Sequence, residues 1–271
     1  MTELQRYSEL HRAFSETSHG QKMSENIRFA KYNLSGMPND EWEKLLGRDV
    51  NNLEHMSLTH GITVAFIRYC ETYQPELLTD EEKKMLLLTA ITHDWGEAIR
   101  GDVSFGDKTQ QEEAQEIKDF DLVVDSVSYG SFNYEEIKQA QEIAFDHHGS
   151  KLGRIFYTIE RLGYMRTALE ASEIVRAQRQ PDETTYGLIW LVADVLSNHM
   201  HQDQLLKDSF RYDAVFAAIT ARHEEIDAAF DLALRHPTAF ENYGQEAQEK
   251  NDSVQLARKQ WRLYKQKYIY D

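Results

Sequence analysis

Two adjacent polar residues, His93 and Asp94, follow an apolar run and are of the types that bind divalent metal ions. Residues 85–91 before them are almost wholly apolar, so we expect a buried helix to carry both side chains. A buried polar group without a partner is costly, and something must therefore satisfy the imidazole and the carboxylate. A divalent cation can do so by accepting one nitrogen and one oxygen ligand. A metal ion is thus the leading candidate for the partner of this dipeptide, although such a dipeptide alone is also common by chance.

Two further polar residues stand in apolar surroundings and extend this set. His55 lies in a segment with helical periodicity, and Asp194 lies between Val192-Ala193 and Val195-Leu196. A charged, unpaired carboxylate there would cost several kcal/mol. With His93 and Asp94 they form a mixed nitrogen and oxygen set, which suits Mn, Fe, Co, Ni or Zn and leaves coordination positions open. The alternative for Asp194 is a helix cap or an ion pair with an arginine such as Arg166.

Two acidic residues beyond the dipeptide are placed to assist catalysis. Glu97 follows His93 by one helical turn, so a continuing helix puts both on the same face. It can take a proton from a water molecule at the metal. Asp102, in a Gly-Asp turn just beyond, can hold that water molecule or the substrate.

The elements that position these residues are predicted to be helices throughout. Alternating β-branched patterns are nearly absent, whereas helical periodicity recurs along the chain, and Thr79 with Glu82 forms a capping-box pattern. The predicted helices cover roughly residues 52–72, 79–98, 110–120, 134–147, 152–178, 183–202, 209–235 and 245–268. The fold class is therefore all-α, and no convincing linker divides it into domains.

The amino-acid composition limits which partners the chain is expected to bind and in which cellular compartment it is expected to occur. The chain of 271 residues has 30 basic and 46 acidic residues, a formal net charge of −16, which disfavours nucleic acids and anionic membranes. Cys70 is the only cysteine, and neither a signal sequence nor a run of 18 apolar residues is evident. We expect a cytoplasmic protein without a membrane partner. A homodimer is a general expectation for such chains.

The order His55, His93-Asp94, Asp194 resembles the H…HD…D signature of the HD-domain superfamily of metal-dependent phosphohydrolases. Glu54 before the first histidine, the HD-x-x-E spacing to Glu97 and the later Gly101-Asp102 are similar to its bacterial 5′-deoxynucleotidase branch, as are the stretches Asp107-Lys108 and Glu112-Glu113-Ala114. The resemblance covers roughly residues 45–115 and 185–200. The interval between Asp94 and Asp194 is longer than in a compact nucleotidase, and the C-terminal helices have no counterpart.

The resemblance implies a role for each matching residue. His55, His93, Asp94 and Asp194 would be metal ligands, Glu97 the catalytic acid/base and Asp102 the residue that orients water or the leaving group. Arg48 would bind the substrate phosphate, with an ordinary surface position as its alternative. In the expected mechanism Lys108 could help Arg48 to neutralise the phosphate charge. Trp42 could stack on a base, although core packing is its alternative role. His147 and His148 would hold a second metal, as added histidines do in some HD proteins. Their alternative role is a favourable interaction with the dipole at the C-terminus of a helix.

These features together predict one HD-type helical bundle over residues 1–271, with a core of about 25–205 and a C-terminal helical extension of 206–271. The expected activity is metal-dependent phosphate release from nucleotides, first of all 5′-(deoxy)nucleoside monophosphates. Three alternatives stay open: hydrolysis of a (deoxy)nucleoside triphosphate or signalling nucleotide, a di-iron oxygenase, and a non-enzymatic interaction protein with a structural metal.

Overall fold

The fold is all-α, as the sequence predicts. The computed structural model describes residues 3–47, 51–101, 109–178, 182–200, 204–236 and 245–270. In these ranges the chain forms helices and connecting segments, and its only β pairing is an isolated bridge between Ile27 and Asn51. Among the same residues, none of the helices has the length and apolar character that a membrane span requires.

Contacts between residues divide the chain into two units, each built from separate stretches of sequence. Unit 1 comprises residues 1–28 and 47–160, and unit 2 comprises residues 29–46 and 161–271. This division by contacts does not test whether the chain is a single domain with a core of about 25–205, and that stays a prediction.

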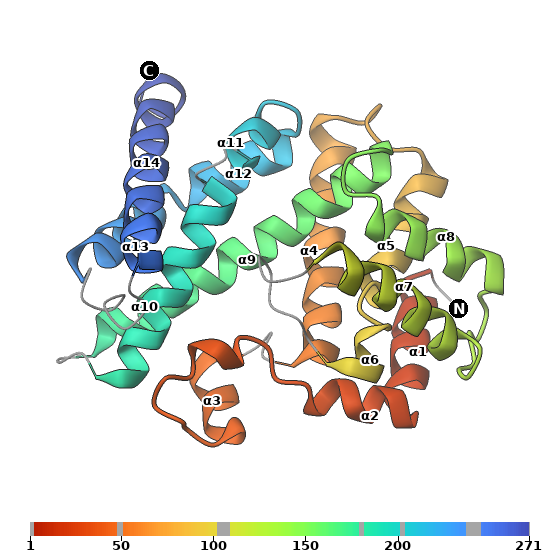
Figure 1. Cartoon of the computed structure of the whole chain (residues 1–271). Coiled ribbons are helices and arrows are strands. Elements are labelled where there is room, and N and C mark those ends of the chain that lie inside the picture. Colours follow the sequence, from red (N-terminus) through yellow and green to blue (C-terminus); the bar gives the residue numbers. More distant parts are fainter. Residues whose placement is uncertain are drawn as a thin grey trace. The chain divides into compact units, whose positions relative to one another are not determined.

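Unit 1 is a helical cluster in which α4 and α5 pack side by side, and α5 also packs against α8 (Figure 1). Its helices are α1 (Glu3–Ser15), α2 (Ser18–Glu25), α4 (Asn52–Tyr73), α5 (Asp80–Thr92), α6 (Glu97–Arg100), α7 (Gln110–Val124), α8 (Tyr134–Phe145) and the first part of α9 (Lys151–Ala177). Buried aromatic side chains link them: Trp95 stacks on Phe14 of α1 at 4.6 Å between ring centroids and lies 6.0 Å from Phe120 of α7.

Unit 2 is formed around α10, which contacts both α13 and α14. It contains the 3₁₀ turn η1 (Ala30–Tyr32), α3 (Asn39–Leu46), the rest of α9, α10 (Glu183–Val195), the π-helical turn η2 (Leu196–Met200), α11 (Gln204–Ser209), α12 (Asp213–Ala221), α13 (His223–Arg235) and α14 (Gln245–Tyr268). The helices α13 and α14 also pack against each other (Figure 1).

Local sequence signals set several helix boundaries. The Thr79 hydroxyl accepts a hydrogen bond from the Glu82 backbone at 3.2 Å, and the Glu82 carboxylate accepts one from the Thr79 backbone at 2.8 Å. This capping box satisfies two backbone donors at the start of α5, as the sequence predicts. The helices α4, α9 and α14 also agree with their predicted ranges to within a few residues.

Two predicted helices are interrupted in the structure. The helix predicted over 79–98 ends at Thr92, because the chain tightens into hydrogen bonds between residues three apart, from Trp95 N to Thr92 O and from Glu97 N to Asp94 O. The helix predicted over 209–235 is divided into the end of α11, α12 and α13, with breaks before Asp213 and at Arg222. Helical periodicity persists across such breaks, so a pattern of apolar residues alone does not reveal them.

A buried histidine of unit 2 makes the stability of the fold sensitive to acid. The ring of His199 stacks on Tyr164 at 5.1 Å between centroids and is almost completely buried. Burial, together with the positive charge of Arg161, lowers the pKa of His199 to about 3 from its ordinary value of 6.5, although Asp194 acts in the opposite direction. The folded chain therefore keeps this imidazole neutral in weak acid.

We predict that His199→Phe weakens the acid dependence of stability. The unfolded chain takes up a proton near pH 6.5 and the folded chain only near pH 3, so the free energy of unfolding falls as the pH decreases through this window. The slope from one such group approaches about 1.4 kcal/mol per pH unit. Urea denaturation at a series of pH values measures it. An unchanged slope in His199→Phe would contradict the prediction.

Candidate metal centre

The turn from His93 to Gly96 is held in place from several sides. The indole of Trp95 is fully buried against Phe14 and Phe120. At Gly96 a Cβ atom would come within 2.6 Å of the backbone oxygen of Glu116, so only glycine lets α7 approach this closely. The turn is thus anchored by Trp95, and the side chains on either side of it are fixed in position.

The imidazole of His93 is oriented by the backbone of its own helix. Its Nδ1 lies 3.1 Å from the Ala90 carbonyl oxygen, which can only accept, so Nδ1 carries the hydrogen. Burial lowers the pKa of His93 to about 4, with further lowering by His55 and Arg28, while Asp94 raises it. The ring is therefore neutral near pH 7, and its Nε2 presents a lone pair.

That Nε2 atom is buried and has no hydrogen-bond partner within the described ranges. A buried acceptor left in this state costs roughly 1–3 kcal/mol, so native proteins rarely leave one unsatisfied. A metal ion would satisfy it, because a neutral imidazole whose other nitrogen donates to a carbonyl group is a common metal ligand.

His55 and Glu160 bring two more ligand atoms to His93. His55 lies in the second turn of α4, whose start is capped by Asn51, and its ring centroid is 5.2 Å from that of His93. Glu160 lies on α9, one turn after Phe156, which packs against the His93 ring. The Glu160 Oε1 atom is 3.5 Å from His93 Nε2. One ligand atom from each of His55, His93 and Glu160 lies within 4.8 Å of the others, so this group could hold a metal ion.

Asp94 connects this group to a second, acidic one. Its Oδ1 lies 3.2 Å from His93 Nε2 and its Oδ2 lies 3.8 Å from His55 Nε2. Carboxylate oxygens of Asp94, Glu97 and Glu116 also lie within 4.8 Å of one another. Glu97 and Glu116 are both buried, and the fully buried amide of Asn52 donates a hydrogen bond to Glu97. Asp94 therefore belongs to the second group and lies next to both histidines of the first.

Asp194 makes its contacts within unit 2. Its carboxylate accepts hydrogen bonds from Lys250 and from the hydroxyl group of Tyr32, and Lys31 lies 3.7 Å away. Burial raises the pKa of Asp194, but Lys250, Tyr32 and Lys31 together outweigh burial and leave it below its ordinary value. The buried carboxylate is thus neutralised by lysines, while Arg166 pairs with Glu170. Its role as a metal ligand stays a prediction.

The other residues singled out in the sequence lie in varied places. Arg48, Asp102 and Lys108 fall outside the described residues. Trp42 is completely buried in unit 2. His147 stacks on Tyr157 at 4.4 Å between ring centroids, and His148 lies edge-on to the same ring. Neither histidine belongs to the two groups that the described residues form, and their role at a second metal stays a prediction.

Sequence reasoning missed Glu160, Glu116, Asn52 and the buried Arg28. Glu160 had only a weak signal, because it follows the buried Ile159 on an amphipathic helix and is nearer to Asp94 along the chain than Asp194 is. Arg28 had little signal, because a single arginine is an ordinary surface residue in most proteins, even between apolar neighbours such as Ile27 and Phe29.

No family model matches this chain, and neither a curated protein nor a solved structure is similar to it.

We predict that Glu160→Gln weakens binding of Mn²⁺ or Zn²⁺ by at least about tenfold, because it replaces the charged carboxylate beside His55 and His93 with a neutral amide. Isothermal titration of metal-stripped protein measures the affinity. Glu170→Gln, the same change on the same helix, leaves it unchanged.

The variant Asp194→Asn tests whether Asp194 or Glu160 is the metal ligand. The contacts of Asp194 with Lys250 and Tyr32 predict that this variant keeps the wild-type metal affinity. If it lost metal binding while Glu160→Gln retained it, the assignment of Glu160 would be wrong and the ligand set expected from the sequence would hold.

Proposed function

We propose that this chain is an HD-type metal-dependent phosphohydrolase that acts on nucleotides, with 5′-(deoxy)nucleoside monophosphates as its first candidate substrates. The observation that carries the proposal is the buried Nε2 of His93, which has no hydrogen-bond donor among the described residues. It lies 3.2 Å from Asp94 Oδ1 and 3.5 Å from Glu160 Oε1, beside a second imidazole. The set suits Mn, Co, Fe, Ni or Zn, because it mixes imidazole and carboxylate ligands without a thiolate.

A divalent cation held by His55, His93, Asp94 and Glu160 would polarise a phosphoryl oxygen and activate water for attack on phosphorus. The chain's own groups provide the remaining functions. Glu97 is buried next to Asp94 and receives a hydrogen bond from Asn52, which fixes its carboxylate. In the proposed reaction it takes the proton of the attacking water and delivers it to the leaving ester oxygen, while an O–P bond forms and the ester P–O bond breaks.

Arg28 is our candidate for binding the substrate phosphate. Its side chain is buried, and its positive charge is one of the causes that lower the pKa of His93, which places it near the candidate centre. A guanidinium group recognises phosphate through two parallel hydrogen bonds. Such a local positive charge would allow a chain with a net charge of −16 to bind an anionic substrate.

We predict that Glu97→Gln lowers kcat for phosphate release by about 10²–10⁴-fold, because it removes the proton acceptor. Metal content stays at the wild-type level, which distinguishes this variant from Asp94→Ala, in which metal-dependent release is abolished. A phosphate-release assay over a panel of nucleotides, run beside metal analysis, measures both. Glu54→Gln, at the exposed position next to His55, is the control. Wild-type kcat in Glu97→Gln would contradict its catalytic role.

We predict that Arg28→Gln raises KM about tenfold or more, with a smaller effect on kcat, because a charged hydrogen bond to phosphate contributes roughly 1.5–3 kcal/mol. Arg28→Lys keeps the charge and recovers part of the affinity. Arg48→Gln tests the arginine expected from the sequence in the same assay; if it raised KM and Arg28→Gln did not, Arg48 would be the phosphate ligand.

The products of the reaction distinguish the proposal from its nearest alternative. Orthophosphate from a monophosphate supports it, whereas pyrophosphate or triphosphate from a nucleoside triphosphate would indicate the triphosphate hydrolase that the sequence left open.

A further inference from the structure

A cavity of about 560 Å³ lies in unit 2 beside α13 and α14, and no residue of the candidate metal centre lines it. Its volume is in the range of small-molecule sites. Polar and basic side chains of α14 dominate its lining, with two leucines at its edges. The lining residues are Leu234, Asn251, Gln255, Arg258, Lys259, Arg262 and Leu263.

The basic character of this cavity contrasts with the rest of the chain. Residues 258–270 contain five basic residues and no acidic residue, although the whole chain has a net charge of −16. Three of these five line the cavity: Arg258, Lys259 and Arg262. The concentration of positive charge around one hollow therefore favours an anionic ligand.

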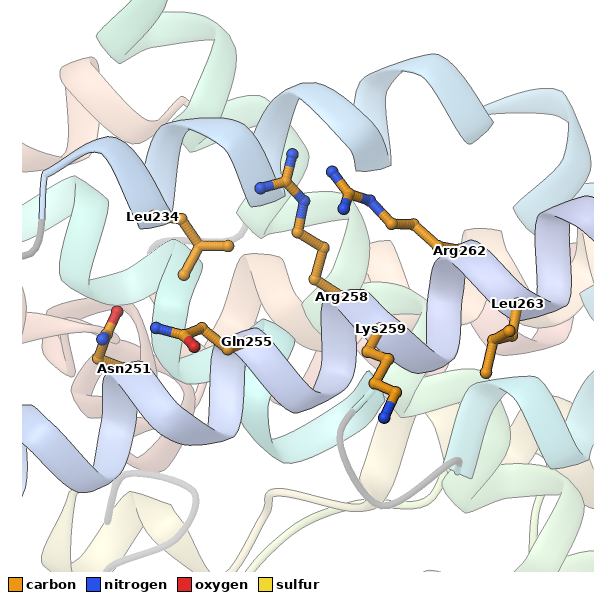
Figure 2. A pocket seen from close by; sticks show the side chains of 7 residues that line it. All are labelled: Leu234, Asn251, Gln255, Arg258, Lys259, Arg262 and Leu263. Carbon is orange, nitrogen blue, oxygen red and sulfur yellow. The ribbon is translucent and has the colours of Figure 1, made fainter.

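The two arginines are arranged as a pair with one counterion. Arg258 and Arg262 are four residues apart on α14, and Figure 2 shows both side chains extending to the same side of the helix. Arg258 is paired with Asp231 of α13, whereas Arg262 makes no ion pair or hydrogen bond with any described residue. Like charges at this spacing repel each other, and a bound anion would relieve the repulsion.

The helix that carries this pair is held firmly in place. Its opposite face is buried through Val254, Ala257, Trp261 and Tyr264. The Trp261 indole donates a hydrogen bond to Asp227 of α13 at 2.9 Å, and Lys265 pairs with the same carboxylate. The cavity-lining face is therefore presented by a fixed helix, which reduces the entropy lost on binding.

We propose that this cavity binds a small organic phosphate of about mononucleotide size. Guanidinium groups bind phosphate through paired, charge-assisted hydrogen bonds, and Arg262 with Arg258 offers two of them. The amides of Asn251 and Gln255 can bind the polar part of the ligand, and Leu234 can pack against its apolar part. The site uses no residue of the candidate metal centre. Evidence against the proposed function would therefore not be evidence against this binding site.

Isothermal titration of the full chain with AMP and with adenosine, both in EDTA, tests the site. We expect saturable AMP binding and at least about tenfold weaker adenosine binding, because only AMP carries the phosphate. Arg262→Gln should weaken AMP binding by about tenfold or more, and Arg262→Lys should have an intermediate effect, since it keeps the charge but loses the planar fork. Because Arg262 has no partner among the described residues, its replacement should leave the melting temperature unchanged.

Lys267→Gln is the matched control, a cation on the same helix that does not line the cavity. Unchanged AMP affinity in this variant supports a defined site. Equal weakening by Lys267→Gln and Arg262→Gln would show diffuse electrostatic attraction and overturn the proposal. An absence of saturable AMP binding, or wild-type affinity in Arg262→Gln, would overturn it as well.

Discussion

One hydrogen bond, from His93 Nδ1 to the carbonyl oxygen of Ala90, determines what the candidate centre of unit 1 can do. It fixes the tautomer and the plane of a buried ring, and it leaves Nε2 as an acceptor with no hydrogen-bond partner among the described residues. Trp95 and Gly96 keep the turn in this position, through stacking in the core and through the close approach of α7. His55 from α4 and Glu160 from α9 then meet at that nitrogen.

The acidic side chains of the two candidate ligand sets have different surroundings in the two units. In unit 2, Asp194 is surrounded by donors, since Lys250 and Tyr32 both hydrogen-bond to it, and these contacts compensate for its burial. In unit 1, Asp94, Glu97 and Glu116 lie close together, and like charges at such distances repel one another. A cation bound by Asp94 beside His93 would offset part of this repulsion without taking Glu97 as a ligand, which is a physical reason, beyond residue type, to expect a metal ion next to Asp94.

Positive charge is concentrated at a few places in this acidic chain. The chain is strongly acidic as a whole, yet Arg28 is buried where it acts on His93, and α14 gathers basic residues around a cavity. Net charge describes the average surface and the long-range attraction of ligands. It does not describe a pocket a few ångströms across, where two arginines outweigh many distant carboxylates.

The sequence by itself determined the helical fold class, the capping box at Thr79 and the range of α4, because these depend on the spacing of residues within one segment. It also marked His55, His93 and Asp94, since each is a polar side chain in an apolar setting. Only the tertiary structure ended α5 at Thr92 and brought Glu160 next to His93. Glu160 lies beside apolar positions of α9, a pattern that many helical residues share. Which carboxylate meets the imidazole within unit 1 depends on which helices pack together, and helical periodicity carries little information about that packing.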